Sequence, residues 1–438
     1  MSGQFDFLVI GDDEASFCAA ACAAKAGAHV GHLKLSRRKK QSAGAAAPAV
    51  PNFVWRRLEL QNYDLTLEPA SARVTLFKEG QSIVTYANPR ETRDALAARD
   101  IPDHDVWVDF VEEVSALANG GFAEPGRGAP LSGKSFAGLL TDPNALARAA
   151  RLYGSCAELA DDYFTDENLQ AHVSAHALAP GGAGGEDAGT ARALAEFFDE
   201  DSWRVRTPDD SPPLLRVLSQ VAKDAGVVGW SGRLKEIARE GAKSIRVHAG
   251  DEEDIKTRFV FFSTPDAAIA AGAADLLAGG PRAKVTVRFK LSNRPEPPAG
   301  DEKSIFQIID NAEDINAASA AAVKGELFEG VPVEFEYAAN GEIIAHTAYF
   351  PAAFYEDGDW RGWTGQDRQA AAAIVKNRIA SRLPDFAAAV RGAQTEVEAP
   401  GARRREIGGW DRVVIQPHRH NAISAAVKLI DKVMLRDE

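Results

Sequence analysis

The feature that most constrains the fold is the order of elements in the first 35 residues. Phe5–Ile10 is a short apolar run that predicts a buried strand, and Gly11 ends it. The Ala-rich stretch Ala15–Ala26 predicts a helix, Gly27 ends it, and Ala28–Leu33 predicts a second strand. A strand, a helix and a strand within about 30 residues form a βαβ unit, which requires a parallel sheet with a right-handed crossover.

Length and composition define the class of protein. The chain has 438 residues, of which 45% are hydrophobic and 26% are charged, so we expect two or three folded units rather than disorder. The net charge is -13, whereas a nucleic-acid-binding protein is normally basic. No apolar run approaches the roughly 18 residues of a membrane helix, and we find no secretory signal at the N-terminus. We therefore expect a cytoplasmic protein with no membrane span and no nucleic-acid partner.

Three cysteines are present, and their spacing does not indicate a cysteine-based site. Cys18 and Cys22 share one face of the first predicted helix, and no further Cys or His cluster lies near them in sequence. We interpret these two residues as small buried thiols and not as a redox or metal site. Together with Cys156 they are too few for a disulfide scaffold, which favours a reducing compartment.

The rest of the chain mixes helical and extended segments. Arg73–Tyr86 predicts a hairpin that turns at Gly80, and Asn340-Gly341 predicts a second hairpin. The five glycine and alanine residues of 181–185 predict a flexible loop. We expect strands over 244–247, 258–262, 284–289, 333–337 and 343–347, and helices over 103–118, 143–164, 213–225, 366–383 and 421–433.

Taken in order, several stretches resemble the phytoene desaturase and flavin amine oxidase group, in particular the bacterial phytoene-dehydrogenase-like relatives of the pyridine nucleotide-disulfide oxidoreductase domain protein. The opening strand with Gly11 and Ala26–Val30 occupies the place of the family's first βαβ unit. Leu214–Ile237 and then Phe259–Pro265 resemble the segment that returns to the flavin domain. Asn421–Ala426 resembles the closing helix that lies over the flavin.

This resemblance implies a two-domain α/β fold, in which an FAD/NAD(P)-binding Rossmann-like domain is joined to a second α+β domain that carries an antiparallel sheet. We assign 1–70, 205–279 and 396–438 to the first domain, and 71–204 and 280–395 to the second. In active relatives FAD accepts a hydride from an apolar substrate, and the cofactor supplies the chemistry. We assign no catalytic residue and no metal ligand in this chain.

The first turn departs from the family's FAD motif. The family carries Gly-x-Gly-x-x-Gly, in which separate glycines allow the tight turn, the close approach of the diphosphate and the packing of the helix. Here only Gly11 matches, because Asp13 and Ser16 replace the other two glycines. Lys34 stands where an acidic residue of the family binds the ribose.

Three further positions are carried over from the family. Leu234 matches the residue whose backbone lines the adenine, if FAD binds. We interpret Gly408 and Gly409 as remnants of the family's glycines that let the backbone approach the flavin ring. We therefore treat these positions, together with those of the first turn, as candidate cofactor contacts whose occupancy is the open question.

Three consecutive carboxylates, Asp12, Asp13 and Glu14, stand at the predicted helix start, where they favour the helix dipole and fill its anion site. A carboxylate about 4 Å from a phosphate charge costs on the order of 1–4 kcal/mol. Our main hypothesis is an eroded FAD site that binds FAD weakly or not at all, in a non-catalytic interaction or regulatory protein with a protein partner. The alternative is an active FAD-dependent oxidoreductase that acts on an apolar substrate through an atypical cofactor pocket.

Two other phosphate-binding hypotheses remain. A nucleotide with a phosphorylated ribose could use Lys34, Arg37 and Arg38, although such basic runs are commonly solvated loops. Gly128–Ser135 matches Gly-x4-Gly-Lys-Ser, in which Lys134 would contact phosphates. No buried strand precedes this stretch, so we expect a surface loop there.

The remaining motifs have ordinary explanations. His172 and His176 lack the Glu of a zinc-protease motif, so we expect two residues of a solvated helix. His418 and His420 flank Arg419 in a predicted loop and require no metal or anion. The following four aromatic residues predict packing at the edge of the second domain or, alternatively, the lining of an apolar ligand cavity: Tyr349, Tyr355, Trp360 and Trp363.

Overall fold

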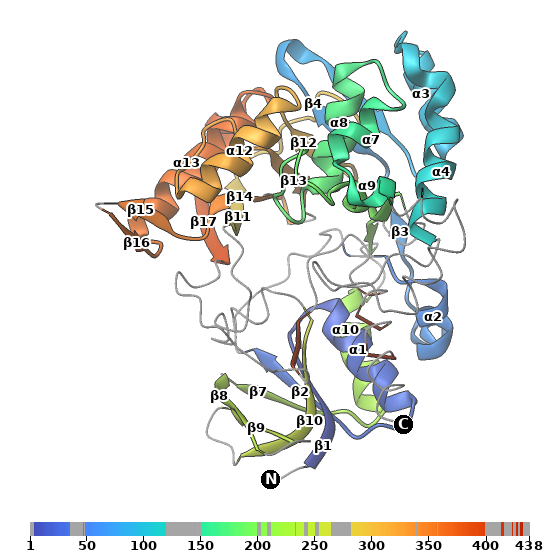
Figure 1. Cartoon of the computed structure of the whole chain (residues 1–438), viewed down its shortest axis with the longest axis vertical. Helices are drawn as coiled ribbons and strands as arrows, with labels where there is room; N and C mark the ends of the chain where they lie inside the picture. The colour runs from blue at the N-terminus through green and yellow to red at the C-terminus, as the bar shows by residue number, and fades with distance from the viewer. Residues whose placement is uncertain are drawn as a thin grey trace.

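The structure is a computed structural model with two lobes, which lie one above the other in Figure 1. Each lobe contains one seven-stranded sheet, and each sheet draws its strands from segments that are far apart in the sequence. The residues that the structure describes are 4–35, 47, 49–119, 147, 150–198, 203–207, 212–232, 234–240, 244–249, 254–263, 282–338, 340–356, 358–398, 413–415, 423, 426–427 and 430–431.

The first lobe is built on a sheet with a parallel centre. Five of its strands run parallel, and the other two form an antiparallel pair that joins the beginning of β10. The strands in spatial order are β7 (Val228–Gly232), β2 (Val30–Leu35), β1 (Gln4–Ile10), β10 (Ile255–Phe262), β9 (Ile245–Ala249) and β8 (Leu234–Arg239), with β18 (Val413–Ile415) also beside β10. The predicted opening βαβ unit is thereby confirmed.

Helix α1 (Glu14–Lys25) packs directly on this sheet because its sheet-facing side is lined with alanines. Phe7 and Val9 of β1 contact this side, whereas Leu8 and Ile10 point to the opposite face, which β8 and β9 cover. The outer side of α1 packs against α10 (Leu214–Asp224) and α2 (Asn52–Leu58). The short side chains therefore let the helix approach the sheet closely, as parallel sheets with helical cover require.

The cysteines are buried and unpaired, as the sequence predicts. Cys18 and Cys22 lie on the outer side of α1, in the apolar cluster that it forms with α2 and α10. Burial raises the pKa of Cys22 to about 12, and it raises the pKa of Cys156 in the second lobe to the same value. Such thiols stay protonated at neutral pH, so they behave as small apolar side chains.

The second lobe is built on a mixed sheet. The predicted hairpins at Arg73–Tyr86 and at Asn340-Gly341 are both confirmed, and β4 with β12 is the parallel pair. Helices α12 (Glu313–Lys324) and α13 (Gly365–Ala380) cover one face of this sheet (Figure 1). The strands in spatial order are β17 (Val390–Glu398), β11 (Arg282–Leu291), β14 (Glu342–Pro351), β13 (Val333–Tyr337), β12 (Ile305–Ile308), β4 (Arg73–Leu76) and β5 (Ser82–Thr85).

A group of helices stands beside the β4–β5 end of this sheet. Its members are α3 (Pro89–Ala97), α4 (Trp107–Asn119), α7 (Cys156–Asp161), α8 (Glu167–Leu178) and α9 (Ala191–Phe197). The remaining short elements are η1 (Leu60–Tyr63), η2 (Lys78–Gly80), η3 (Pro102–Val106), α14 (Phe386–Ala389), β15 (Phe354–Glu356) and β16 (Asp359–Arg361).

Two sequence expectations in this region are wrong. The single helix expected over 143–164 is interrupted at Gly154, because Ser155 forms a capping box with Glu158 and starts α7. The glycine-rich stretch 181–185 is not a flexible loop but is mostly buried. A Cβ on Gly182 would lie 2.0 Å from the carbonyl oxygen of Ala348, so glycine is needed there for close packing.

A short two-stranded ribbon joins the lobes. The chain rises from the first lobe through β3 (Glu68–Pro69) and returns through β6 (Val205–Arg206), and these two strands pair antiparallel with each other. A bridge between Ala47 and Val205 adds a third segment to the ribbon. The domain boundaries proposed from the sequence, near residues 70 and 205, fall in this ribbon, although the exact division of the chain stays a prediction.

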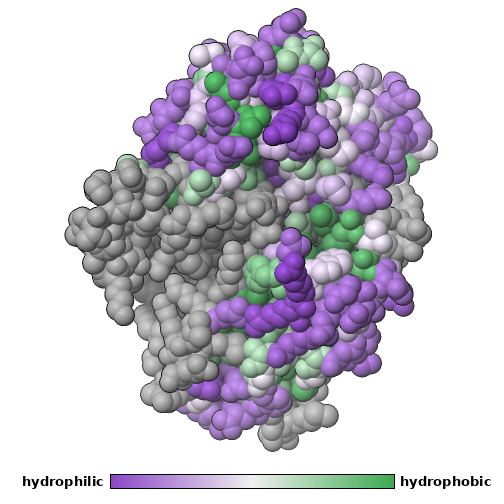
Figure 2. Space-filling model, turned by 90° about the vertical axis from the view of Figure 1, so that its right-hand side faces the viewer, coloured by the Kyte–Doolittle hydropathy of each residue, from purple (hydrophilic) through white to green (hydrophobic). Residues whose placement is uncertain are grey.

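The surface seen in Figure 2 is mostly hydrophilic, with small and separate hydrophobic patches over its described part. This pattern agrees with a chain of net charge -13. Within the described residues, no helix is both long enough and apolar enough to cross a membrane.

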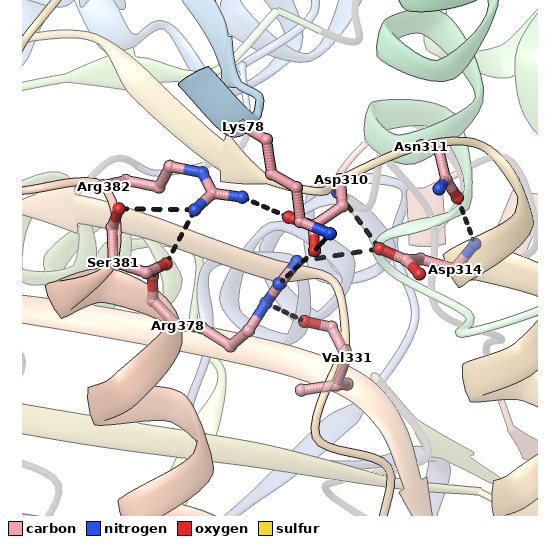
Figure 3. A network of polar contacts seen from close by, with 8 residues as sticks. All are labelled: Lys78, Asp310, Asn311, Asp314, Val331, Arg378, Ser381 and Arg382. Atoms are coloured by element: carbon pink, nitrogen blue, oxygen red, sulfur yellow. Dashed lines mark hydrogen bonds and ion pairs between the residues drawn. The ribbon is translucent and has the colours of Figure 1, made fainter. Parts of the chain in front are cut away.

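A charged network fastens four segments of the second lobe to one another (Figure 3). The Asp310 carboxylate, which follows β12, binds Lys78 Nζ at 3.0 Å, Arg378 Nη1 at 3.1 Å and the guanidinium of Arg382. Burial opposes ionisation of Asp310, but the three cations outweigh it and hold its pKa below the ordinary value. The backbone N–H of Asp310 donates to Asp314 at the start of α12. One carboxylate thus joins the β4–β5 turn, the end of β12 and the end of α13.

We predict that Asp310→Asn destabilises the protein by about 3 kcal/mol, because it leaves two nearly buried guanidinium groups without their shared counter-ion. Denaturant unfolding at neutral pH measures the loss. The pKa of Asp310 is lowered, so its contribution is present above the unfolded value of 3.8 and is lost as the pH falls below it. Asp94→Asn, which breaks an exposed pair with Arg93, serves as the control and should change stability by less than about 0.5 kcal/mol. An equal effect of both variants would contradict the role of the network.

Candidate functional site

The first turn of the βαβ unit is tightly closed around Gly11. The N–H of Gly11 donates to the carbonyl oxygen of Leu33, and its own carbonyl oxygen accepts a hydrogen bond from Nε2 of His32 at 3.0 Å. A Cβ on Gly11 would lie 2.3 Å from Oγ of Ser263 and 2.9 Å from Cβ of Ser16. Glycine is therefore required at this position by the side chains of the protein itself.

The Asp13 side chain caps α1 and closes the turn. Its Oδ1 accepts from the N–H of Ser16 at 2.8 Å, and its Oδ2 accepts from Oγ of Ser263 at 2.5 Å. Oγ of Ser16 in turn donates to the carbonyl oxygen of Asp13 at 2.7 Å. This is the hydrogen-bond pattern of an N-cap, with one additional bond that reaches a strand 250 residues away. Both carboxylate oxygens are thus engaged by the chain.

Ser263 reaches this turn because of the strand register. β10 runs parallel to β1, with Phe262 opposite Ile10, so the residues that follow the two strands lie side by side. The N–H of Ser263 donates to the carbonyl oxygen of Ile10 at 3.2 Å. Ser263 lies in the segment Phe259–Pro265, which resembles the family, but the sequence alone does not mark it as a site residue. Its position at the carboxyl end of a strand parallel to β1 is the signal that could have identified it.

The acidic start of α1 is electrostatically linked to the second lobe. Glu14 is 8% exposed, and it acts on the guanidinium of Arg204 together with Glu334 and Glu336 of β13. Burial disfavours the charged form of Arg204, but the three carboxylates outweigh burial and raise its pKa. The negative charge at the start of α1 is thus balanced by the helix dipole and by a cation of the protein.

These contacts do not fit the diphosphate of a dinucleotide at the start of α1. A diphosphate in a βαβ unit needs a glycine-lined turn and the backbone amides of the helix start. Here the Ser16 amide is capped by Asp13, and the hydroxyls of Ser16 and Ser263 lie against Gly11. The same turn carries three consecutive acidic residues, Asp12, Asp13 and Glu14, whose negative charges would oppose a phosphate there. Fitting the group would require these side chains to move.

The structure brings Gly11, Asp13 and Ser16 together at the first turn, places Lys34 beside α1, and places Leu234 in the apolar cluster on the opposite face of the sheet. Lys34 lies on β2, with its Nζ 5.4 Å from the centre of the Phe17 ring on α1. Leu234 lies at the beginning of β8 and shares an apolar cluster with Leu33 and Leu35, the neighbours of Lys34. Gly408 and Gly409 lie outside the described residues. The cofactor roles of all these positions stay predictions.

The expectation of a solvated histidine pair is wrong. His172 is fully buried on α8, where its Nδ1 lies 2.7 Å from the hydroxyl of Thr75 and its Nε2 lies 3.0 Å from that of Thr85. Burial lowers the pKa of His172 to about 3, so the ring is neutral. His176 is also buried, and its ring stacks near that of Phe197. Both residues belong to the interior of the second lobe.

The aromatic residues divide into two pairs. Tyr349 is buried and donates to the carbonyl oxygen of Ala183, and Nε1 of Trp363 donates to that of Pro351. Tyr355 and Trp360 are 54% and 46% exposed and pair across the β15–β16 hairpin. The first pair packs within the second lobe, whereas the second pair lies on its surface.

Other motifs give no site in the described part of the chain. The phosphate-loop-like stretch Gly128–Ser135 and the residues Arg37, Arg38, His418 and His420 lie outside it. Among the described residues, no group of three or more His, Cys, Asp or Glu side chains is arranged to hold a metal ion.

Neither a protein-family model nor a curated protein matches this sequence. Solved structures do match it over nearly its whole length. An oxidoreductase from Methanosarcina mazei is 11% identical with a TM-score of 0.55, covering 99% of this chain and 100% of its own. Cyclohexylamine oxidase from Brevibacterium oxydans is 12% identical with a TM-score of 0.52, covering 99% of both chains. A Rab GDI from Plasmodium falciparum is 8% identical with a TM-score of 0.52, covering 98% of this chain and 96% of its own.

The comparisons confirm the fold expected from the sequence. The chain has a Rossmann-like domain with the fold of FAD/NAD(P)-binding domains and a second α+β domain with a largely antiparallel sheet, the fold of the amine oxidases. Identities of 8–12% show the fold alone. The closer relation to phytoene desaturases and the erosion of the FAD motif stay predictions from the sequence.

We predict that stability falls as the pH is lowered from 6.5 towards 4, partly through His32. Burial lowers the pKa of His32 to about 4, so between these values the unfolded chain binds a proton that the folded chain does not. A shift of this size corresponds to about 3 kcal/mol, and His172, whose pKa burial also lowers, contributes in the same direction. His32→Gln keeps a donor for Gly11 but removes the titration, so its stability should fall less steeply. Denaturant unfolding at several pH values measures how the free energy of unfolding changes with pH.

The control is His104→Gln, which replaces a half-exposed histidine. If the free energy of unfolding of His32→Gln and of wild type depends on pH in the same way, His32 is not a cause of the pH dependence.

Proposed function

We propose that this chain is a non-catalytic interaction or regulatory protein built on the flavin amine oxidase fold. One observation supports this proposal above the others: the Asp13 carboxylate, held by Ser16 and Ser263, lies at the helix start that a dinucleotide diphosphate would need. One of its hydrogen bonds caps the Ser16 amide at the helix start, and the other holds the Ser263 hydroxyl. We infer that FAD binds weakly or not at all, and that the partner of the protein is another protein.

The comparisons are compatible with this proposal. The fold is shared by proteins named as oxidases and by a Rab GDI, so the fold by itself does not require oxidase chemistry. What distinguishes one function from another is therefore the chemistry of the site. In this chain Gly11 matches the FAD-binding pattern of the family, whereas Asp13, Ser16 and Lys34 depart from it.

The second candidate is an FAD-dependent oxidoreductase with an atypical pocket. The observation in its favour is that solved amine oxidases match over 99% of the chain, so the whole two-lobe frame is retained. In that case FAD would supply the redox chemistry, and the protein would have to bind it with Asp13 displaced from the start of α1. The substrate would then bind between the first lobe and the sheet of the second.

The visible absorption spectrum distinguishes these candidates. We predict that the protein purified from cells with ample riboflavin lacks the yellow absorption bands of a flavin, and that its heat-released supernatant lacks flavin fluorescence. Titration with added FAD then measures any weak binding. Stoichiometric flavin in the purified protein would rule out the non-flavin proposal and favour the oxidoreductase.

A triple substitution tests whether the altered first turn is what weakens FAD binding. We predict that Asp13→Gly with Ser16→Gly and Lys34→Glu raises FAD affinity at least about tenfold, or about 1.4 kcal/mol, because it removes the capping carboxylate, opens the turn and restores an acidic residue at the end of β2. Quenching of FAD fluorescence measures the affinity.

The triple variant needs two controls. Circular dichroism checks that it folds, since losing the N-cap costs about 1 kcal/mol. Asp12→Gly removes one neighbouring charge but leaves the Asp13 cap in place, so its gain should be smaller. If the triple variant folds and gains no affinity over wild type, the altered turn is not what limits FAD binding.

A further inference from the structure

Backbone hydrogen bonds hold the ribbon between the lobes on both of its sides. The N–H of Ala70 donates to the carbonyl oxygen of Arg204 at 2.8 Å, and Ala47 and Val205 exchange two backbone hydrogen bonds of 2.7 and 2.9 Å. Three segments of the chain therefore run side by side at this crossing. A backbone bonded on both sides has little freedom to rotate, whereas hinges absorb large changes of backbone angle.

Arg204 extends this ribbon to the sheet of the second lobe. Its Nη1 donates to Oε1 of Glu334 at 2.7 Å, and its Nη2 lies 3.8 Å from Oε1 of Glu336, both on β13. The side chains of Arg204 and Glu334 are 25% and 18% exposed, and that of Glu336 is 3% exposed. The low exposure makes these charge contacts stronger than a surface pair.

A second basic residue anchors the ribbon from the other side. Arg73, at the start of β4, is 4% exposed, and its guanidinium lies 3.8 Å from the centre of the Phe197 ring and 4.1 Å from that of Trp203. Nε1 of Trp203 donates to the carbonyl oxygen of Ala70 at 2.8 Å. A guanidinium between two aromatic rings is a strong and directional contact when water is excluded.

We propose that the β3–β6 ribbon, with Arg204 bound to Glu334 and Glu336 and with Arg73 held between Phe197 and Trp203, is an interlobe clasp that fixes the orientation of the two lobes. The clasp holds the ribbon to the second sheet at the point where the chain enters and leaves the second lobe. Arg204 also acts electrostatically on Glu14 at the start of α1, so the same cation is attracted by both lobes. The clasp is therefore expected to limit the motion of one lobe relative to the other.

The clasp is tested by a distance measurement between the lobes. Spin labels at the exposed positions Lys223 on α10 and Lys324 on α12, each changed to Cys, report the interlobe distance, because the native cysteines are buried. We expect Arg204→Met to broaden the distance distribution relative to the wild-type background. We also expect amide exchange at 66–72 and 203–207 to speed up at least about tenfold, while both sheets keep their protection.

Matched variants separate the clasp from general destabilisation. Arg294→Met removes an ion pair with Glu302 that lies wholly within the second lobe, so it should leave the interlobe distances unchanged. If Arg204→Met does not fold, the double variant Glu334→Gln with Glu336→Gln removes both negative charges that attract Arg204 while keeping side-chain volume and hydrogen-bond acceptors, and it should broaden the distribution in the same direction. A distribution and exchange rates identical to wild type in the folded variant would overturn the proposal. The outcome is independent of FAD binding, which the proposed function concerns.

Discussion

The hydrogen bonds of the Asp13 carboxylate connect the parts of the first lobe on which the rest of the structure depends. One oxygen caps α1 and the other holds the hydroxyl of Ser263, so the helix start and the end of β10 are tied at the same point. Every βαβ unit must satisfy the free amides at the start of its helix. In a dinucleotide-binding protein a phosphate does this, whereas here a side chain does.

The acidic residues at the start of α1 also act on Arg204, which contacts the second lobe. A helix start favours negative charge from any source, whether phosphate or carboxylate. Carboxylates at this place repel phosphate but attract cations, and Arg204 stands where it interacts with Glu14 and with the two glutamates of β13. Glu14 at the start of α1 and the two glutamates of β13 thus all favour the charged form of Arg204. A change at the start of α1 is expected to be felt at β13 as well.

Sequence reasoning succeeded where structure is determined locally. The opening strand and helix, the hairpin turns at Gly80 and Gly341, and the burial of Cys18 and Cys22 follow from short-range patterns of apolar residues and glycines. The sequence also placed three carboxylates at the start of this helix, and the structure adds that one of them, Asp13, is its N-cap.

It failed where a residue's surroundings come from distant segments. Ser263 meets Asp13 only because β10 pairs with β1 in one particular register. His172 appeared to belong to a solvated helix because the sequence of α8 shows no clear apolar face. Its actual environment is supplied by Thr75 and Thr85 on the β4–β5 hairpin, nearly 100 residues earlier. No pattern within α8 contains that information.

The alternation of β13 bears on what could bind between the lobes. Val333, Phe335 and Tyr337 pack into the core beneath the helices, so Glu334 and Glu336 must point to the opposite face, where Arg204 meets them. An apolar molecule placed against this part of the sheet would have to remove water from ionised groups, at a cost that its own contacts could not offset. On this face of β13 the protein therefore supplies its own charged partner, Arg204, which joins the ribbon to the second sheet.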